Sequence, residues 1–354
     1  MSIEAAFDGR RNNFDMLRLF AALLVLWSHS YPITSGENRG EIFSLISGGY
    51  DTGGGYGVSI FFVISGFLVT ASVQRHRTAD YLKSRLLRIV PALIPLTLFE
   101  IFVIGLCFTR LPAGEFLRQE ETWRHFLNPA VFPLSPNLPG VFGDLPAKTV
   151  NGSLWTLPLE CGFYVLLPFF SVAALLTERG MAVLLGGLAA LYAIATWTLG
   201  LGWQSQGLLL WSGTSAFVAM RYGLFFLSGA GLWIWRRHIP LDGGLACCAL
   251  LMLVAAAQTS GATFAYFFCL PYLVVYAALA RPMPFDVSAK IGDLSYGIYL
   301  YAFPIQQAVT ASIGPGATPS AVSAVATPIA LVLAYLSWRI VESPCLALRR
   351  RLSP

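Results

Sequence analysis

Charged side chains are scarce in this sequence: Asp, Glu, Lys and Arg make up 12% of its 354 residues, whereas a soluble protein averages about 25%. Hydrophobic residues make up 56%, and the mean hydropathy is +0.65. Few charges between long apolar runs exclude an ordinary soluble domain. We therefore expect a protein whose chain crosses a membrane many times.

The sequence also lacks the patterns expected of a nucleic-acid-binding protein and of a metal-binding protein. The net charge of +5 comes without a basic face, because the basic residues form short clusters between apolar runs. Such clusters indicate membrane topology and argue against a nucleic-acid partner. The six cysteines fall almost entirely within apolar runs and show no metal-ligand spacing, so we expect no metal site and interpret them as packing residues.

Ten mainly apolar segments are long enough to cross a bilayer, which takes about 17 to 25 residues. They predict an all-α, polytopic transmembrane helix bundle of about ten spans, formed by a single domain over residues 1–354. Only ESPCLALRRRLSP follows the last segment, so we expect no fused extracytoplasmic domain. The segments are 14–33, 56–74, 86–108, 152–176, 181–199, 214–235, 243–259, 262–280, 293–312 and 319–340.

The distribution of basic residues predicts the orientation. With ten spans, 17 of the 23 lysines and arginines fall on the side that carries both termini. Because cytoplasmic loops are enriched in Lys and Arg, we expect both termini to be cytoplasmic.

One apolar segment carries an ionisable side chain far from its ends. The run RLFAALLVLWSH begins at Arg18 and reaches His29 eleven residues later. With Arg18 near the inner interface, a rise of ~1.5 Å per residue puts His29 about 16 Å into a hydrocarbon core roughly 30 Å thick. Ionisable groups at that depth are costly, so they indicate a functional site.

A second such group is Glu160, in the run NGSLWTLPLECGFY. Nine residues inward from Asn151, on the outer side, correspond to about 14 Å by the same rise. We therefore expect His29 and Glu160 to meet near the middle of the membrane, with His29 as general base and Glu160 fixing its tautomer. The alternative is that a backbone carbonyl satisfies His29, while Trp155 or a tyrosine satisfies Glu160.

Basic residues are concentrated at the predicted cytoplasmic side of the third segment. The five in RHRTADYLKSRLLRIVP are Arg75, Arg77, Lys83, Arg85 and Arg88. Arg85 and Arg88 are three residues apart and share a helix face, so together with Arg18 they suit a phosphate-bearing ligand. Topology and attraction to anionic lipids are the alternative, which fits the two earlier arginines better.

Prolines and long loops mark further candidate features. Pro91 and Pro95 are expected to interrupt the third segment, and Pro158 to break the helix beside Glu160. Residues 109–151 contain six prolines. Loops of that length are usually functional or disordered, so this one is either a stiff cap or a lid that binds an acceptor.

Six motifs, in this order, resemble the acyltransferase type 3 family over nearly the whole chain. The spacing of Arg18 and His29, combined with FFVISGFL, is the most specific part of the resemblance. The motifs are RLFAALLVLWSH, GYGVSIFFVISGFL, YLKSRLLRIVP, SLWTLPLE, LSYGIYLYAFP and RIVESP.

The resemblance implies a multi-pass enzyme of the bacterial inner membrane that moves acyl groups, commonly acetyl, from cytoplasmic acyl-CoA to sugars of surface or exported polysaccharides. Acetyl-CoA or another acyl-CoA is then the donor, a glycan or lipid-linked glycan is the acceptor, and membrane lipid surrounds the protein. The resemblance implies a catalytic role for His29 and donor binding by Arg18, Arg85 and Arg88, and it strengthens the case for Glu160. We therefore expect His29 and Glu160 to be catalytic, and these arginines together with Lys83 to bind the donor.

Two positions depart from the family pattern. Ala302 stands where members often have a histidine, and Ser59 stands where an acidic residue often follows the GV motif. Neither change touches His29 or the arginines, so the departures concern the acceptor more than the reaction.

The sequence leaves open both the route of acyl transfer and the choice between an enzyme and other kinds of membrane protein. His29 either deprotonates a sugar hydroxyl or first takes the acyl group itself, while Ser65 and Ser153 are either oxyanion donors or packing residues.

The main alternative to an acyltransferase is a proton-coupled transporter or flippase of a lipid-linked sugar or acyl carrier. Such carriers usually show internal repeats, and neither the Arg18-to-His29 pattern nor FFVISGFL recurs. A structural scaffold needs neither a buried histidine nor paired arginines.

Overall fold

The computed structural model describes the chain except residues 8–11, 202–208, 211–213, 260, 282–286 and 353–354. Helices account for 75% of it, and the described residues form no strand, which confirms the all-α prediction. Arg10 and Arg11, and the side chains of Arg349, Arg350 and Arg351, contribute to the predicted orientation but lie outside the described residues.

Each of the ten predicted segments overlaps one long helix of the described chain, and the helix of the third segment begins at Thr78, eight residues before the predicted residue 86. These helices are α2 (Phe14–Ser35), α4 (Gly53–Arg75), α5 (Thr78–Phe99), α9 (Thr156–Val172), α10 (Glu178–Trp197), α11 (Ala216–Ile234), α12 (Gly243–Ala256), α13 (Ala262–Leu279), α15 (Ser295–Ile313) and α16 (Pro319–Ser337). The shorter ones are α1 (Ile3–Ala6), α3 (Ile42–Ile46), α6 (Leu106–Phe108), α7 (Ala113–Phe116), α8 (Glu120–Arg124), α14 (Val287–Ile291), α17 (Ser343–Leu352), the 3₁₀ turns η2 (His125–Ala130) and η4 (Gly314–Gly316), and the π-helical turns η1 (Glu100–Gly105) and η5 (Trp338–Glu342).

Seven helices of the described chain are long and apolar enough to cross a membrane. They are α2, α4, α5 with its continuation to Phe108, α10, α11, α13, and α16 with its continuation to Leu348. Large apolar side chains such as Val172, Val183 and Phe268 point outward and are mostly exposed. A helix that is apolar on its outer face needs lipid there, so the protein is a multi-pass membrane protein.

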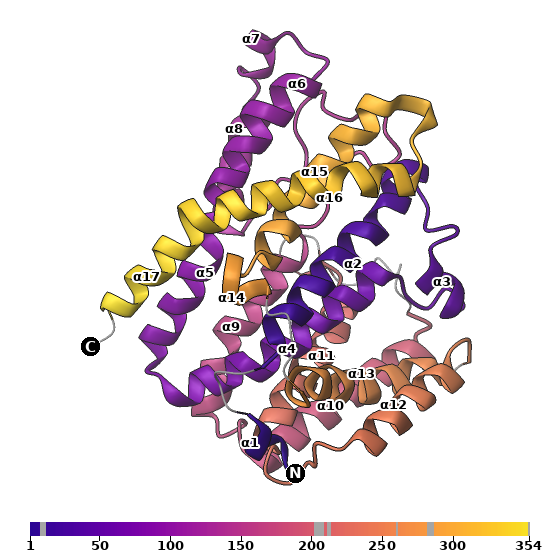
Figure 1. Cartoon of the computed structure of the whole chain (residues 1–354), viewed down its shortest axis with the longest axis vertical. Helices are drawn as coiled ribbons and strands as arrows, with labels where there is room; N and C mark the ends of the chain where they lie inside the picture. The colour runs from indigo at the N-terminus through magenta and orange to yellow at the C-terminus, as the bar shows by residue number, and fades with distance from the viewer. Residues whose placement is uncertain (8–11, 202–208, 211–213, 260, 282–286, 353–354) are drawn as a thin grey trace.

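Helix α4 forms the centre of the bundle, where it packs against α2, α9, α11 and α13 (Figure 1). Its contact with α11 depends on two glycines that face the opposite backbone. A Cβ atom at Gly66 would lie 1.9 Å from the carbonyl oxygen of Phe226, and one at Gly229 would lie 2.1 Å from that of Val63. Small residues at such crossings let two membrane helices approach closely.

Replacing Gly66 by valine should destabilise the bundle, because α4 and α11 would have to move apart. We expect a loss of about 1–3 kcal/mol, as for other overpacked cores, measured as a lower unfolding midpoint of the purified protein in detergent. Gly187→Val on α10 is the control, since a Cβ there meets no atom within 4 Å. Equal midpoints for the two variants would show that the close approach contributes nothing.

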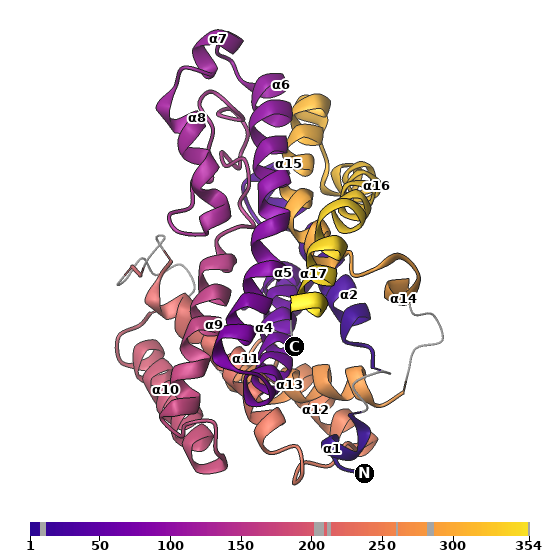
Figure 2. The same cartoon turned by 90° about the vertical axis from the view of Figure 1, so that its left-hand side faces the viewer.

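A small second core stands on the end of α5. Residues 109–150, called the cap below, contain α7, α8 and η2 and rise above the bundle in both views (Figures 1 and 2). Buried apolar residues join the cap to η1: Ile101, Ile104, Phe116, Leu138, Val141, Phe142 and Val150. The predicted loop is therefore a folded cap with its own apolar cluster.

The prolines do not act as predicted. Helix α5 runs through both Pro91 and Pro95 without interruption. Helix α9 begins at Thr156, so Pro158 lies in its first turn. An N–H there has no intrahelical acceptor, and proline therefore breaks nothing at that position.

Candidate active site

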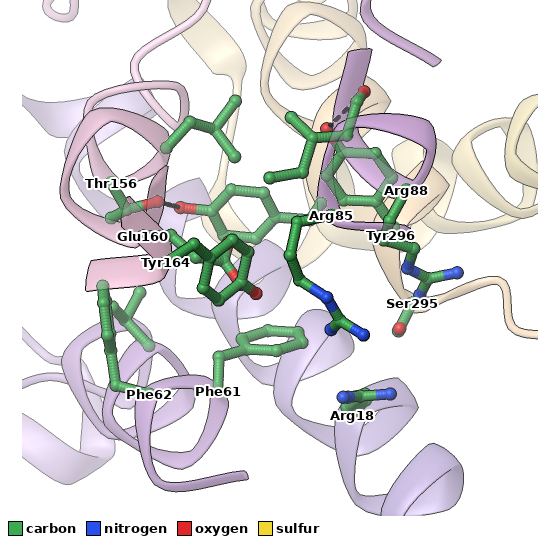
Figure 3. Close-up of a pocket in the computed structure, with 14 residues that line it drawn as sticks. Arg18, Phe61, Phe62, Arg85, Arg88, Thr156, Glu160, Tyr164, Ser295 and Tyr296 are labelled. Carbon is green, nitrogen blue, oxygen red and sulfur yellow. Dashed lines mark hydrogen bonds between the residues drawn. The ribbon is translucent and has the colours of Figure 1, made fainter. Parts of the chain in front are cut away.

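Two helices bring three of the predicted donor-binding residues, all arginines, together around a cavity of about 90 Å³. We call it the arginine cavity; α2 contributes Arg18, α5 contributes Arg85 and Arg88, and α9 contributes Glu160. Figure 3 shows the three guanidinium groups gathered on one side, with Glu160 and Tyr164 on the other. Its remaining lining is Val58, Phe61, Phe62, Ile89, Thr156, Leu157, Ser295, Tyr296 and Tyr299.

Two of these arginines are held by one carboxylate that the sequence reasoning missed. Asp293 accepts a hydrogen bond from Arg88 and lies 4.0 Å from the Nη1 atom of Arg18. Ser295 donates from its backbone N–H and its hydroxyl to the other oxygen of Asp293. Asp293 thus holds Arg88 and helps to position Arg18, which also donates a hydrogen bond to Asp15 at 3.3 Å.

Arg85, unlike Arg18 and Arg88, is not held by a carboxylate of the described residues. Its Nε donates to Ser84 Oγ at 3.2 Å, and its guanidinium lies 5.9 Å and 5.8 Å from the ring centres of Tyr81 and Tyr164. Aromatic faces orient a guanidinium without neutralising it. Arg85 therefore keeps its charge free for an anionic ligand.

The Glu160 carboxylate is satisfied by hydroxyl groups of its own surroundings. Tyr164, one turn later on α9, donates a hydrogen bond to Oε1, and Ser65 Oγ lies 3.5 Å from the same atom and 3.0 Å from the Tyr164 hydroxyl. This agrees with the alternative in which a tyrosine satisfies Glu160.

The residues before α9 are buried although they are not helical. Asn151 N–H donates to the Pro136 carbonyl at 3.3 Å, Ser153 N–H donates to Asn151 Oδ1 at 3.1 Å, and the Ser153 carbonyl accepts from Tyr299 at 2.8 Å. Irregular backbone is tolerated at depth in a membrane only where the protein satisfies it. Because this segment is not helical, Glu160 lies only four residues into α9, about 6 Å by the helical rise.

His29 opens onto a second, wider cavity of about 780 Å³, called the histidine cavity. Residues 36–52, between α2 and α4, and the first turn of α4 form much of its wall, and Trp155, Tyr222 and Tyr299 add aromatic rings. No residue of the cap lines it in the described structure. The lid role predicted for residues 109–151 therefore finds no support in the shape of either cavity.

His29 itself is held mainly by packing. Its ring meets Phe303 edge-on, with ring centres 5.4 Å apart. Its Nδ1 is buried and has no hydrogen-bond partner among the described residues. Pro32, on the next turn, lacks the N–H that would bond the Ser28 carbonyl, which loosens the helix beside His29. Gln306 anchors the same stretch, donating to the Leu26 carbonyl at 2.7 Å.

The contact predicted between His29 and Glu160 is not formed. No hydrogen bond joins them in the described structure, and they line different cavities. Two residues, Val58 and Tyr299, line both cavities and separate them. Depth along the membrane normal was the basis of the prediction, and equal depth leaves lateral position undetermined.

The remaining basic residues of the third segment lie away from the cavity. Lys83 is exposed and does not line it. Arg75 stacks over Trp233, 5.1 Å from its ring centre, and Arg77 is exposed. Helical spacing explains the difference, because residues 83 and 85 point to different sides of α5.

A buried ion pair beside the histidine cavity was also missed. Asp51, which lines that cavity, accepts a hydrogen bond from Arg221 of α11, and both side chains are almost fully buried. The guanidinium also lies 5.1 Å from the ring centre of Tyr50. A signal was present: Arg221 interrupts the apolar run AFVAMRYGLFF, and a charge inside a membrane helix calls for a partner.

A second missed network ties the cap to the bundle. Glu100, at the start of η1, accepts from Asn151 Nδ2 at 2.7 Å and pairs with His125 Nε2 at 2.8 Å. All three side chains are buried, and Asn151 also donates to the Leu300 carbonyl at 3.0 Å. Glu100 lies within the third apolar segment. Ionisable side chains inside such segments indicate functional sites, so the argument used for His29 applies to Glu100 as well.

The two residues that depart from the family pattern, Ala302 and Ser59, are buried in the helix bundle. Ala302 is buried in a cluster with Ala22, Leu26 and Ala334. Ser59 is buried, and its hydroxyl donates to the Gly55 carbonyl one turn earlier, at 2.8 Å. Neither position lines a cavity in the described structure.

Comparison with known proteins agrees with the family resemblance of the sequence motifs. A family model described as an acyltransferase domain matches residues 11–339. The chain is similar to an O-acetyl transferase of Shigella phage Sf6, with 29% identity over 342 residues that cover 94% of this chain and 95% of that protein. It is also similar to nodulation protein 10 of Rhizobium leguminosarum bv. viciae, with 29% identity over 376 residues that cover 98% and 96%. No solved structure matches it.

Proposed function

Because the chain belongs to the acyltransferase type 3 family and is an acyltransferase, we propose that it transfers an acetyl group from cytoplasmic acetyl-CoA to a hydroxyl of a surface or exported polysaccharide, or of its lipid-linked precursor. The observation that carries this proposal is the pair of adjoining cavities. One presents three arginines, and the other presents a histidine.

The arginine cavity supplies the donor site in this proposal. The phosphates of acetyl-CoA bind at Arg85, with Arg18 and Arg88 held in place by Asp293. Charge-assisted hydrogen bonds from arginine suit phosphate groups. Lys83 is left out because it is exposed and outside the cavity.

The histidine cavity supplies the acceptor site. It is wide, and Trp155, Tyr222 and Tyr299 offer aromatic faces, while Asp51 offers carboxylate oxygens. Aromatic rings and fixed polar groups together are what a sugar ring with hydroxyls requires. The name of the phage relative, an O-acetyl transferase, supports a hydroxyl as the group that is modified.

His29 acts as the general base of the transfer. It takes the proton of the acceptor hydroxyl, whose oxygen attacks the thioester carbonyl; the C–O bond forms, the C–S bond breaks, and the proton passes to the CoA thiolate. Its Nδ1 is buried and has no partner among the described residues, so Nε2 is the ring nitrogen that would accept this proton from the histidine cavity. Glu160 serves on the donor side, where it orients the Tyr164 and Ser65 hydroxyls.

The finer topology is part of the same proposal. Ten spans in a single domain place both termini in the cytoplasm of a bacterial inner membrane, with the arginine cavity toward the cytoplasm. The excess of basic residues on the side of the termini supports this orientation. The acceptor then enters from the outer side.

The test is direct transfer in a defined membrane. Purified protein in lipid vesicles is given acetyl-CoA labelled in the acetyl group, together with a polysaccharide and glycolipid extract of the source cell. The proposal requires label in the extract, released by mild alkali as expected for an O-ester. Label that crosses the vesicle membrane without esterification would indicate a carrier instead.

Arg85→Ala should weaken donor binding more than it slows the chemical step. Loss of a charge-assisted hydrogen bond costs about 1.5–3 kcal/mol, which predicts a rise in KM for acetyl-CoA of about 10- to 100-fold. Arg77→Ala, an equal charge change at an exposed position before α5, should leave KM unchanged. Equal KM values for the two variants would remove Arg85 from the donor site.

A further inference from the structure

We propose that Val58 and Tyr299 set the size of the acyl group that this protein transfers and restrict it to short chains. The inference rests on the proposed function, because it concerns the path between the donor and His29. We call these two residues the partition, since they line both cavities.

The partition is built from two helices. Val58 comes from α4 and Tyr299 from α15, and they are 6% and 7% exposed. On one side lie Arg85 and Glu160, and on the other lies His29. Little of either side chain is open to solvent, so a group that passes from one cavity to the other meets Val58 and Tyr299 directly.

The partition is also held firmly in position. The Tyr299 hydroxyl donates to the Ser153 carbonyl at 2.8 Å and lies 2.6 Å from Thr156 Oγ1, so Thr156 is its donor. The Tyr299 ring packs edge-on against Phe61, with ring centres 5.8 Å apart. Val58 is β-branched, and such side chains have one strongly preferred rotamer in a helix. A longer acyl chain therefore cannot gain room by a simple side-chain rotation.

The chemistry decides which part of the donor must pass. The phosphates stay at the arginines, while the thioester carbonyl has to reach the side where His29 activates the hydroxyl. As the acceptor C–O bond forms and the C–S bond breaks, the acyl group stands between Val58 and Tyr299. The methyl groups of Val58 are thus the atoms that a longer chain meets.

The test compares donors of increasing length in the vesicle assay described above. Acetyl-, propionyl- and butyryl-CoA, each labelled in the acyl group, are used with the parent protein, Val58→Ala and Val58→Ile. Val69→Ala is the matched control, because Val69 is a buried valine of the same helix that lines neither cavity. The readout is the ratio of kcat/KM for butyryl-CoA to that for acetyl-CoA.

We expect Val58→Ala to raise this ratio by about 10-fold or more, the usual effect of one methylene in an apolar pocket, and Val58→Ile to lower it. Val69→Ala should leave it unchanged. The inference is overturned if either active Val58 variant keeps the parent ratio, or if Val69→Ala shifts it equally. A parent protein that transfers none of the three acyl groups would instead overturn the proposed function itself.

Discussion

His29→Ala should abolish measurable acetyl transfer while leaving the fold intact. The histidine makes no hydrogen bond through Nδ1 in the described structure, so its removal leaves no polar partner of that atom unsatisfied. Loss of a general base typically lowers the rate by about 10²–10⁴-fold. The measurement is incorporation of labelled acetyl into the extract, alongside the unfolding midpoint of the variant.

His238→Ala is the matched control, because His238 is exposed and pairs with Glu178 far from both cavities. Parent-like transfer by His29→Ala would remove the residue from the mechanism. A double variant with Glu160→Gln tests the independence of the two groups. Separate cavities predict that their effects combine, whereas a catalytic unit would show no further loss in the double variant.

Glu100→Ala should cause the largest loss of stability among these variants. It leaves His125 Nε2 and Asn151 Nδ2 without their acceptor in a fully buried site. Breaking a buried pair by removing one partner costs about 3–5 kcal/mol. We expect a much lower unfolding midpoint in detergent and rapid proteolysis within the cap.

Glu115→Ala, an exposed carboxylate of α7, is the control and should stay within about 0.5 kcal/mol of the parent. A Glu100→Ala protein with the parent midpoint would show that the cap is held by its apolar cluster alone. Because Asn151 also reaches the Leu300 carbonyl, the parent network connects the cap to α15.

The helices could be predicted from the sequence because apolar runs fix their positions directly. Each predicted segment overlaps a long helix, and the arginines three residues apart on α5 do face one cavity. The start of α9 was predicted wrongly: the apolar segment was placed from residue 152, but residues 152–155 form turns and the helix begins at Thr156. Hydrogen bonds to Pro136, Tyr299 and Leu300 stabilise residues 151–155, and no local pattern reveals such distant partners.

The lateral arrangement of the helices in the bundle could not be predicted from the sequence. Counting residues gives depth along a helix, but His29 and Glu160 at similar predicted depth open onto different cavities. Asp293 lies 205 residues from Arg88, its partner. Arg221 and Glu100 could have been identified from the sequence as charges within apolar runs. Their partners Asp51 and His125 lie outside the ten long helices, in segments whose positions only the fold determines.

The partition has a consequence for the cell that carries this protein. An energised membrane stores about 2.3 kcal/mol per elementary charge for each 100 mV, and any continuous column of water through it would let protons leak. If the two cavities open to opposite sides of the membrane, as proposed, the side chains that line both, Val58 and Tyr299, would stand between them. In that arrangement the residues that limit the acyl group would also serve as electrical insulation.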